Sequence, residues 1–291
     1  MRSGIVAVVG RPNVGKSTLV NALVGTKVAI VSDKPQTTRR DVRGILNTPA
    51  AQVVFTDTPG FHKPRTTLGA RSNDRVADAV EGVDVTIQVV DAEAGVGRGD
   101  AYVHDRHVAG HPGVAICAVN KIDAVAHHRL VPQLAAAEAL GDWDEIVPVS
   151  ASAGTGVPLL GELILSYLPE GPLLYPEGEV TDQPLETRLG ELVREQALRI
   201  TREEVPHSVA VVVEEIERSD DLTRVHASIV VERPSQKGIL IGAKGATLRA
   251  VGSAARPEME SLLGTRVFLD LRVKVMKDWQ RDPRALDRLG L

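Results

Sequence analysis

The sequence lacks the paired cysteines typical of secreted proteins and the long apolar runs typical of membrane proteins. Its 291 residues include one cysteine, Cys117, and aromatic residues make up 3% of the chain. One cysteine excludes an internal disulfide and fits a reducing compartment, and its place in an apolar run predicts inert core packing. The sequence has no apolar run of about 20 residues, so we expect no membrane-spanning helix. We also expect no signal peptide, because a basic and then apolar pattern is missing at the start.

The sequence also lacks an overall excess of basic charge, since its formal net charge is −4. Residues 1–183 carry 16 Lys and Arg against 21 Asp and Glu, whereas residues 234–291 carry 11 against 6. The acidic part cannot attract nucleic acid by charge, while the basic segment can. A solvated helix face is the other explanation for that basic segment.

The first half of the chain alternates strand-like apolar runs with helical patterns. This is typical of an α/β fold with a mostly parallel sheet and helices on both faces. We predict strands at 5–9, 42–47, 52–56, 85–90, 114–119 and 146–149, and helices at 16–24, 70–81, 99–109, 128–139 and 157–168. The second and third strands leave no room for a helix between them, so we expect an antiparallel pair at the sheet edge. Ligands of such folds bind at the carboxyl ends of the strands.

Prolines and glycines then interrupt this pattern. We predict a first domain at 1–168, a semi-rigid linker at 169–184 and a second domain at 185–291. The second domain reads as helix 185–200, strands 208–217 and 223–232, helices 235–241 and 246–263, strand 266–276 and a polar tail. The resulting α-β-β-α-α-β order predicts an α+β domain.

The most informative motif follows the first predicted strand. Residues 10–17 read G-R-P-N-V-G-K-S, a phosphate-binding loop between a strand and a helix. Its glycines let successive N–H groups point at one centre, and the helix N-terminus adds positive partial charge. We expect Lys16 to reach the β- and γ-phosphates and Ser17 to ligate Mg²⁺. The expected nucleotide contacts of this loop are Gly10, Arg11, Pro12, Asn13, Val14, Gly15, Lys16, Ser17 and Thr18.

A second motif, Asp57-Thr58-Pro59-Gly60, ends the third predicted strand. A carboxylate in this place can hold Mg²⁺ through water, and the Gly60 N–H can meet a γ-phosphate. The motif also makes a good turn, but its position about 40 residues after a phosphate loop favours the nucleotide-site interpretation. We therefore expect Asp57, Thr58, Pro59 and Gly60 to line the same pocket as the loop.

Between these motifs lies the polar segment Pro35-Gln36-Thr37-Thr38-Arg39-Arg40. One of its threonines should close over Mg²⁺ when a triphosphate is bound, and we favour Thr38 with Thr37 as the alternate. We expect the segment to order with triphosphate and to loosen after hydrolysis. A plain surface turn is the other interpretation. The predicted Mg²⁺ ligands are thus Ser17, Thr38 and Asp57.

Two further segments predict which base is bound. Asn120-Lys121-Ile122-Asp123 follows the strand at 114–119, and Ser150-Ala151-Ser152 follows the last one. A carboxylate at Asp123 can accept hydrogen bonds from guanine N1–H and the 2-amino group, whereas adenine lacks both donors. We expect Asn120 to bridge neighbouring loops, the Lys121 stem to pack on the base, and the Ala151 N–H to donate to guanine O6. The expected base contacts are Asn120, Lys121, Asp123, Ser150, Ala151 and Ser152.

Hydrolysis requires an oriented water, and the usual glutamine after D-x-x-G is replaced here by Phe61. A phenyl ring cannot orient water, so we expect slow intrinsic turnover. The Asn13 carboxamide can help to hold a monovalent cation, K⁺, near the β- and γ-phosphates. Three arginines, Arg39, Arg40 and Arg65, are weaker candidates for that charge, and contact with solvent or with a partner's phosphates is the alternative. The expected catalytic residues are Asn13, Lys16, Thr38 and Gly60.

The second domain contains I-G-x-x-G at residues 241–245, between two helical patterns. In this setting the motif resembles the KH fold, whose loop clamps about four nucleotides of RNA backbone. We expect Ile239, Leu240 and Ile241 to form an apolar floor for bases, and Trp279 either to pack or to stack. A helix-turn-helix without an RNA role is the alternative. The expected RNA contacts are Lys237, Gly238, Ile239, Ile241, Gly242, Ala243, Lys244, Gly245 and Arg249.

Together, G-R-P-N-V-G-K-S, P-Q-T-T-R, D-T-P-G, N-K-I-D, S-A-S and V-E-R-P-S-Q-K-G-I-L-I-G-A-K-G resemble the Era family of bacterial GTPases along essentially the whole chain. The resemblance implies a P-loop GTPase domain followed by a type II KH domain. It also implies hydrolysis of GTP to GDP with Mg²⁺, stimulation by K⁺, and a missing catalytic glutamine. Family members vary at the position of Ala243, so Lys244 is the only charge in the loop here.

The same resemblance implies a factor for assembly of the small (30S) ribosomal subunit that binds the 3′ region of 16S rRNA. It implies a cytoplasmic protein, with peripheral contact to the inner membrane face, and we expect a monomer. One alternative is an RNA-binding protein whose hydrolysis is incidental. Another is a tRNA-modification GTPase of the TrmE type, although no folate-binding region is recognisable. A tandem GTPase of the Der type would need a second phosphate-loop motif, which is absent.

Overall fold

The chain divides into two units whose boundaries do not follow the sequence order strictly. The computed structural model describes residues 1–61, 66–201, 205 and 208–291. The first unit consists of Met1–Ala29, Thr38–Arg65 and Gly69–Asp182, and the second of Ile30–Thr37, Thr66–Leu68 and Gln183–Leu291. The second unit therefore takes in short segments that the sequence places between elements of the first domain.

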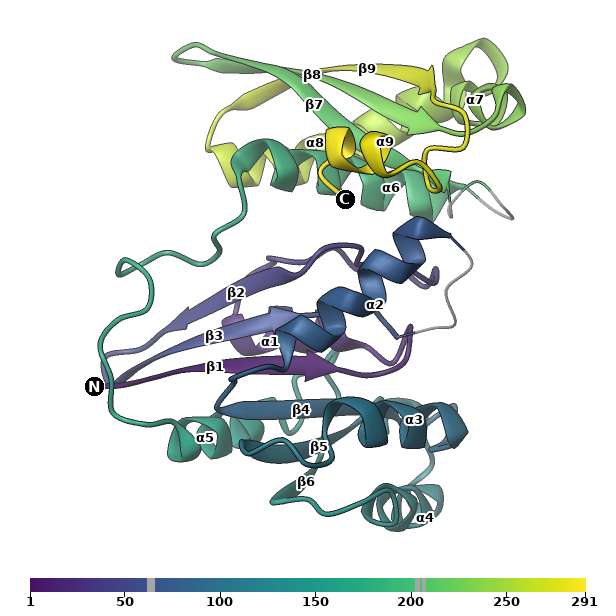
Figure 1. Ribbon diagram of the computed structural model, residues 1–291. Coiled ribbons are helices and arrows are strands. Elements are labelled where there is room, and N and C mark those ends of the chain that lie inside the picture. The colour runs from purple at the N-terminus through teal and green to yellow at the C-terminus, as the bar shows by residue number, and fades with distance from the viewer. Residues whose placement is uncertain (62–65, 202–204, 206–207) are drawn as a thin grey trace. The chain divides into compact units, whose positions relative to one another are not determined.

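The first unit contains one six-stranded sheet (Figure 1). Its strands are β1 (Arg2–Val9), β2 (Val42–Asn47), β3 (Ala51–Asp57), β4 (Val85–Asp91), β5 (Val114–Asn120) and β6 (Glu145–Pro148), in the order β2-β3-β1-β4-β5-β6. Strand β2 at the edge pairs antiparallel with β3, and the other pairings are parallel. The predicted antiparallel edge pair is confirmed.

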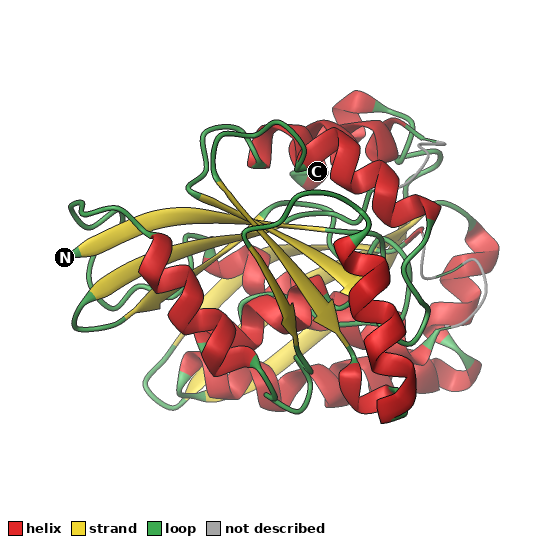
Figure 2. Cartoon of the chain, turned by 90° about the horizontal axis from the view of Figure 1, so that it is seen from below, coloured by secondary structure: helices red, strands yellow, loops and turns green. Residues whose placement is uncertain are grey.

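Helices cover both faces of this sheet, because successive residues of a strand point to opposite sides (Figure 2). Val6 and Val8 of β1 enter one core with Leu19 and Leu160, whereas Ala7 enters another. The helices are α1 (Lys16–Val24), α2 (Thr67–Ala79), α3 (Arg98–His107), α4 (His127–Glu138) and α5 (Val157–Tyr167), with a 3₁₀ turn η1 at Ile122–Ala124. Apolar residues of α1 and α5 pack on one face of the sheet, and those of α2, α3 and α4 on the other.

Cys117 lies in the core on the α4 side of the sheet and is fully buried. Burial, with a smaller contribution from Asp100, raises the pKa of its thiol to about 12. The thiol therefore stays protonated, as expected for a packing residue.

Most of the predicted linker lies against the sheet of the first unit. The Gln52 side chain accepts hydrogen bonds from the N–H groups of Leu174 and Tyr175 and donates one to the Tyr175 carbonyl. The Ile45 N–H donates to the Val180 carbonyl at 2.9 Å. This part of the segment is held along β2 and β3 by these hydrogen bonds.

The second unit is built on three strands, β7 (Ala210–Arg218), β8 (Leu222–Val231) and β9 (Arg266–Val275). Strands β7 and β8 pair antiparallel, and β8 and β9 pair parallel. Its helices are α6 (Leu185–Ile200), α7 (Pro234–Ile241) and α8 (Ala246–Leu263), with a 3₁₀ turn η3 at Ala243–Gly245 between the last two. The predicted α-β-β-α-α-β order is confirmed, and α6 and α8 contribute much of the apolar core.

The prediction of a polar tail was wrong. The C-terminal residues form a further helix, α9 (Pro283–Leu289), and Trp279 has no exposed surface. The indole N–H donates to the Ser208 carbonyl at 3.3 Å, and Leu286 and Leu289 are buried in the same cluster. Trp279 is thus a packing residue and cannot stack on RNA. Among the described helices, none combines the length and apolar character needed to cross a membrane.

Candidate functional site

The phosphate-loop residues connect β1 to α1 at the carboxyl edge of the sheet, where the fold predicts a ligand site. Gly15 has a φ of +97°, and a Cβ at this position would lie 2.3 Å from Asn120 Nδ2. Only glycine allows this close approach of the loop to the base-recognition segment. The loop therefore follows the backbone path that its glycine pattern predicts.

Lys16 begins helix α1 and is 6% exposed. Its ammonium donates to the carbonyls of Gly10 at 3.2 Å and Arg11 at 3.0 Å. Burial lowers the pKa of Lys16 to about 8, against an opposing contribution from Asp57. The side chain therefore points back over the loop, where it can meet phosphate oxygens.

Three oxygen-bearing side chains meet beside the loop. The Ser17 hydroxyl donates to Asp57 Oδ2 at 2.6 Å, and the Thr38 hydroxyl donates to the same oxygen at 3.2 Å. The Ser17 and Thr38 hydroxyls are 3.0 Å apart. All three residues that the sequence predicts as Mg²⁺ ligands are thus brought together from α1, β3 and the segment before β2.

This group suits a hard divalent cation. Asp57 is fully buried, burial raises the pKa of its carboxyl, and its Oδ1 atom has no hydrogen-bond partner in the described part of the chain. A buried carboxylate oxygen without a partner is costly unless a ligand satisfies it. One carboxylate and two hydroxyls leave room for phosphate oxygens and water, which Mg²⁺ prefers to an all-protein cage.

The structure also distinguishes the two threonines that the sequence left open. The Thr37 hydroxyl donates to the Lys34 carbonyl at 2.6 Å, within its own turn. The Thr38 hydroxyl instead joins Ser17 and Asp57. The geometry therefore favours Thr38 as the metal ligand.

The base-recognition segments are joined to the loop through Asn120. Its side-chain amide donates to the Val14 carbonyl at 2.9 Å, and its oxygen accepts the Ala151 N–H at 3.0 Å. Asp123 lies in the 3₁₀ turn η1 with an exposed side chain, so its carboxylate is free to meet a base. The Ser150 and Ser152 hydroxyls lie 3.3 Å apart on the same loop.

The D-T-P-G turn lies directly against the phosphate loop. The Thr58 hydroxyl donates to the Val8 carbonyl at 2.8 Å, and a Cβ on Gly60 would lie 2.7 Å from Pro12 Cα. The Phe61 ring packs on Tyr102 and His107 of α3, with centroids 5.0 and 5.2 Å away. The Phe61 ring thus packs against α3, and it has no hydrogen-bonding group that could orient a water molecule.

Of the three arginines considered for charge supply, Arg39 is 4% exposed. The expectation of a solvated side chain was therefore wrong for this residue. Its carbonyl accepts a hydrogen bond from Arg75 at 2.6 Å. Arg65 lies outside the described residues.

The I-G-x-x-G segment of the second unit joins α7 to α8 through η3. Lys244 has a φ of +48° and an exposed side chain, and Ile239 is 52% exposed. Lys237 and Arg249 are also exposed. Leu240 is fully buried in the core, so its predicted place in an RNA-facing floor was wrong.

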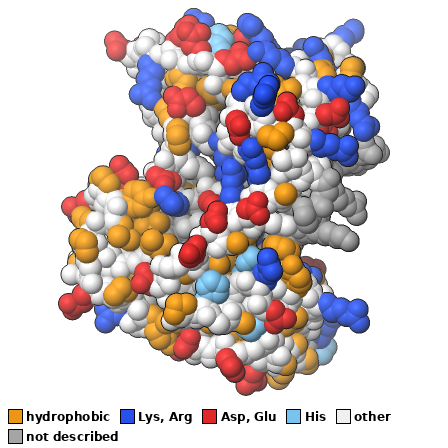
Figure 3. All heavy atoms as spheres, in the orientation of Figure 1, with side chains coloured by type: hydrophobic (Ala, Val, Ile, Leu, Met, Phe, Trp, Pro, Cys, Tyr) orange, Lys and Arg blue, Asp and Glu red, His pale blue; other side chains and the backbone are white. Residues whose placement is uncertain are grey.

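The glutamine before this loop has a structural task that the sequence did not reveal. Gln236 is 5% exposed, and its side-chain oxygen accepts the N–H groups of Glu232 and Arg233, both at 3.0 Å. It therefore fixes the entry into α7 by satisfying N–H groups ahead of the helix. On the visible face of this unit, Lys and Arg side chains gather in several groups separated by acidic ones (Figure 3).

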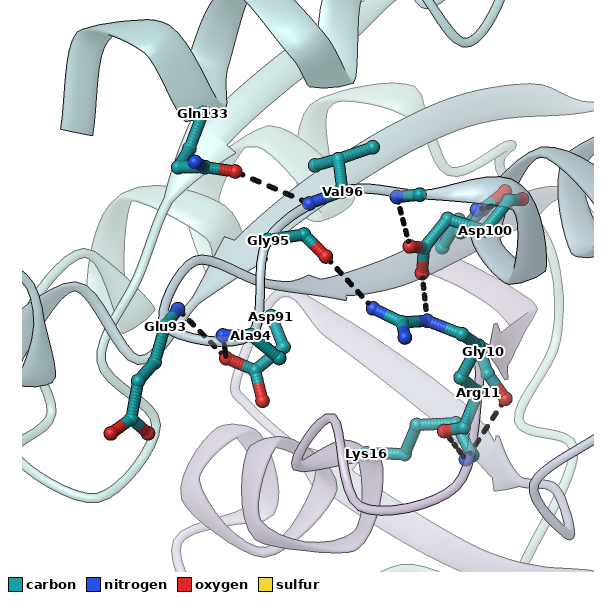
Figure 4. Close-up of polar contacts among 12 residues, drawn as sticks. Gly10, Arg11, Lys16, Asp91, Glu93, Ala94, Gly95, Val96, Asp100 and Gln133 are labelled. Atoms are coloured by element: carbon teal, nitrogen blue, oxygen red, sulfur yellow. Dashed lines mark hydrogen bonds and ion pairs between the residues drawn. The ribbon is translucent and has the colours of Figure 1, made fainter. Parts of the chain in front are cut away.

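Two carboxylates that the sequence did not predict as site residues lie close to the nucleotide site. Asp91 ends β4, and Asp100 lies in the first turn of α3 (Figure 4). The position of Asp91 at the carboxyl end of a parallel strand is the signal that could have identified it. Asp100 has no local signal, because only the fold brings it to Arg11.

The fold and these side chains define a P-loop nucleotide-binding protein that carries a KH-type domain. A family model described as a 50S ribosome-binding GTPase matches residues 5–121, and a KH domain model matches residues 204–280. GTPase Era of Mycobacterium sp. (strain KMS) is 52% identical over 294 residues, covering 99% of this chain and 98% of that protein. GTPase Era of Mycobacterium avium (strain 104) is 53% identical with the same coverage.

Solved structures give the same result. A crystal structure of Era in complex with MgGDPNP and nucleotides 1506–1542 of 16S ribosomal RNA matches with a TM-score of 0.96 and 40% identity, covering 100% of this chain and 99% of that chain. An Aquifex aeolicus Era variant bound to GDP·AlF4⁻ matches with the same score, identity and coverage. The chain belongs to the Era family of GTPases. The resemblance and the fold class predicted from the motifs are confirmed.

Proposed function

We propose that this protein binds GTP and GDP with Mg²⁺, hydrolyses GTP slowly, and binds the 3′ region of 16S rRNA through its KH domain during assembly of the small ribosomal subunit. The observation that carries the proposal is the full-length match to Era crystallised with MgGDPNP and nucleotides 1506–1542 of 16S ribosomal RNA. The meeting of the Ser17, Thr38 and Asp57 oxygens beside the phosphate loop and the exposure of Lys244 support the proposal.

Each group has a defined task in this proposal. Lys16 and the loop N–H groups hold the phosphates, Ser17, Thr38 and Asp57 hold Mg²⁺, and Gly60 meets the γ-phosphate. Bound Mg²⁺ would offset the negative charge that develops on the phosphates. The proposed base contacts are Asn120, Lys121, Asp123, Ser150, Ala151 and Ser152.

The RNA contacts are proposed for the loop between α7 and α8. Glycines there allow a sugar–phosphate chain to come close, and Lys244 supplies the charge. Ile239 offers an exposed apolar side chain on which a base can rest. The proposed contacts are Lys237, Gly238, Ile239, Ile241, Gly242, Ala243, Lys244, Gly245 and Arg249.

Single-turnover GTP hydrolysis with and without a 16S 3′-end RNA tests whether the protein is a switch. A faster rate with this RNA, and no change with a 23S rRNA fragment of equal length, supports a GTPase switch for the small subunit. An unchanged rate with tight RNA binding would favour an RNA-binding protein whose hydrolysis is incidental. Acceleration by the 23S fragment alone would favour the large subunit, which the description of the matching GTPase family names.

We also propose that Asn13 helps to hold K⁺ near the β- and γ-phosphates. Asn13 has a φ of +64° inside the loop, a conformation that is uncommon for residues other than glycine and that concentrates at functional sites. Replacing KCl with NaCl at equal ionic strength should slow hydrolysis. An Asn13→Ala variant should lose that difference.

The remaining proposals concern the setting in the cell. A cytoplasmic monomer with peripheral contact to the inner membrane face fits the family resemblance. Sedimentation of the purified protein, alone and with vesicles of anionic lipid, measures both properties. The domain limits proposed above, 1–168 and 185–291, can be checked by limited proteolysis.

A further inference from the structure

The loop after β4 contacts both ends of the nucleotide site. We call residues 91–97 the strap loop (Figure 4). At its beginning, Asp91 Oδ1 accepts the N–H groups of Glu93 at 2.9 Å and Ala94 at 3.1 Å, which fixes the turn. Its other oxygen, Oδ2, accepts Lys121 Nζ at 2.5 Å. Lys121 belongs to N-K-I-D, so this end of the strap loop is attached to the base-recognition segment.

The other end of the strap loop is attached to the phosphate loop. Arg11 Nε donates to Asp100 Oδ1 at 2.8 Å, and Arg11 Nη2 donates to the Gly95 carbonyl at 3.0 Å. Asp100 Oδ2 accepts the Gly97 N–H at 2.9 Å. The Arg11 guanidinium therefore contacts both the strap loop, at Gly95, and Asp100, whose carboxylate also accepts the N–H of Gly97.

The Arg11–Asp100 contact is a built feature rather than a surface ion pair. The Asp100 side chain is fully buried, and that of Arg11 is 30% exposed. The stem of Arg11 packs on the start of α3, since a Cβ on Gly99 would lie 2.5 Å from Arg11 Cδ. Loss of Arg11 would leave the buried Asp100 carboxylate without its ion-pair partner, which is more serious than loss of an exposed pair.

Arg11 also lies next to the phosphate-binding amine. Its carbonyl accepts Lys16 Nζ at 3.0 Å, and the Asn120 carbonyl accepts the Ala92 N–H at 2.9 Å. A continuous set of hydrogen bonds thus runs from Lys121 through Asp91, the strap loop and Arg11 to Lys16. Each link is short, and the two buried carboxylates can adopt few other arrangements.

We propose that the strap loop, held by Lys121–Asp91 at one end and by Arg11–Asp100 at the other, sets the spacing between the base-recognition segment and the phosphate loop. Arg11, Asp91 and Asp100 are positioning residues in this view: they do not touch nucleotide with their side chains but preorganise the groups that do. The inference rests on the nucleotide site of the proposed function. Its consequence is that damage at one end of the strap loop weakens contacts at the other.

Dissociation constants and dissociation rates of fluorescent GDP and a GTP analogue test this. Arg11→Gln, Asp91→Asn and Asp100→Asn should each weaken both nucleotides by about tenfold, within the range typical of coupled sites, mainly through faster dissociation. Arg98→Gln and Asp105→Asn make the same chemical changes at exposed positions of α3 and should stay within twofold of the unmodified protein. Arg11→Lys should recover part of the loss, because it keeps the charge but lacks the planar fork of donors that meets Asp100 and the Gly95 carbonyl together.

The decisive variant combines Asp91→Asn with Asp100→Asn. Once one end of the strap loop is released, releasing the other end should have little further effect on nucleotide affinity. The affinity of the double variant should therefore lie within about twofold of that of the weaker-binding single variant. If the two losses multiply to about 100-fold, the residues act separately and the strap proposal is wrong. Unchanged affinity in all three single variants would also overturn it. Failure of the unmodified protein to bind guanine nucleotides would instead contradict the proposed function.

Amide hydrogen exchange of the unmodified, nucleotide-free protein provides a second test that needs no variant. The N–H groups of Glu93, Ala94, Gly95 and Gly97 are hydrogen-bonded and should exchange slowly, together with those of the phosphate loop. Fast exchange in residues 93–97 beside a protected phosphate loop would contradict a positioning role. If the single variants fail to fold, this measurement decides the question.

Discussion

The Ser17 hydroxyl lies 2.6 Å from Asp57 Oδ2, although the two residues are 40 positions apart in the chain. The sheet makes this possible, because β1 and β3 are parallel neighbours and both end at the same edge. The second carboxylate oxygen of Asp57 is buried with no hydrogen-bond partner in the described residues. A cation between these groups and a phosphate would satisfy that oxygen.

Thr38→Ala should slow single-turnover GTP hydrolysis by about 10- to 100-fold and raise the Mg²⁺ concentration needed for half-maximal rate, since a hydrogen-bonding ligand to a charged group is worth about 1.5–3 kcal/mol. Thr37→Ala is the matched control, because its hydroxyl is bonded to the Lys34 carbonyl. A rapid-mixing assay over a range of Mg²⁺ measures both. Equal effects of the two variants would contradict the assignment of Thr38.

Lys16→Ala should weaken GTP and GDP by about 100-fold, a loss of about 3 kcal/mol, because the ammonium is the main cation in the phosphate loop. Burial lowers the pKa of Lys16 to about 8, which means that the folded protein disfavours the charged form of this side chain. The nucleotide-free variant should keep a Tm within a few degrees of the unmodified protein. Calorimetric titration measures the affinity, and a variant that retains GTP affinity would refute the phosphate-loop role.

Asp123→Asn should weaken GTP by at least about 100-fold and improve the binding of XTP. The carboxylate accepts two donors from guanine, whereas an amide can pair with the carbonyl that xanthine carries in place of the 2-amino group. Competition of GTP, XTP and ATP against a fluorescent nucleotide measures the change. If the order of preference stays the same, another residue selects the base.

Lys244→Glu should weaken binding of a 16S 3′-end RNA by at least tenfold and leave GTP affinity unchanged. Lys244 supplies the charge of its loop, and the substitution turns attraction to phosphate into repulsion. Arg218→Glu is the control and makes a charge change of the same size at an exposed site. Arg218 lies at the end of the β7–β8 pair opposite to the end that leads into α7, so its substitution should have a smaller effect. Filter binding at two salt concentrations measures both variants, and equal losses would remove the loop from the RNA site.

His107 should make the nucleotide-free protein acid-sensitive. Burial, with Arg106 and His111 nearby, lowers its pKa to about 4 from 6.5, and its side chain is 2% exposed. The unfolded chain then binds more protons between pH 6.5 and 4, so the stability present above pH 6.5 is lost as the pH falls. At pH 5 the loss is about 2 kcal/mol, or about 5 °C in Tm.

The variant His107→Phe keeps a ring against Phe61 and removes this titration. Its Tm should fall less than that of the unmodified protein between pH 7.5 and 5. His128→Phe, at an exposed position of α4, is the control and should keep the full pH dependence. Equal pH dependence in all three proteins would show that His107 is not responsible.

Much of the fold could be predicted because its signals are local. Strand β2 and helices α1, α6 and α8 begin and end where the apolar pattern and the glycines predict. Helix α9 was missed, because its short pattern lies among charged residues. Its leucines are buried because Trp279 and β7 cover them in the folded protein, a contact that the local sequence does not show.

The sequence alone determined the order of the elements as far as β9 and the segments of the nucleotide site, because the phosphate loop, D-T-P-G, N-K-I-D and S-A-S each carry their geometry within a few residues. The tertiary structure alone decided that Thr38 rather than Thr37 joins Asp57, that Trp279 is buried, and that Arg11 contacts Asp100. These relationships join residues that are far apart in the chain. No local pattern records them, since they depend on which strands become neighbours and which side chains share the same buried space.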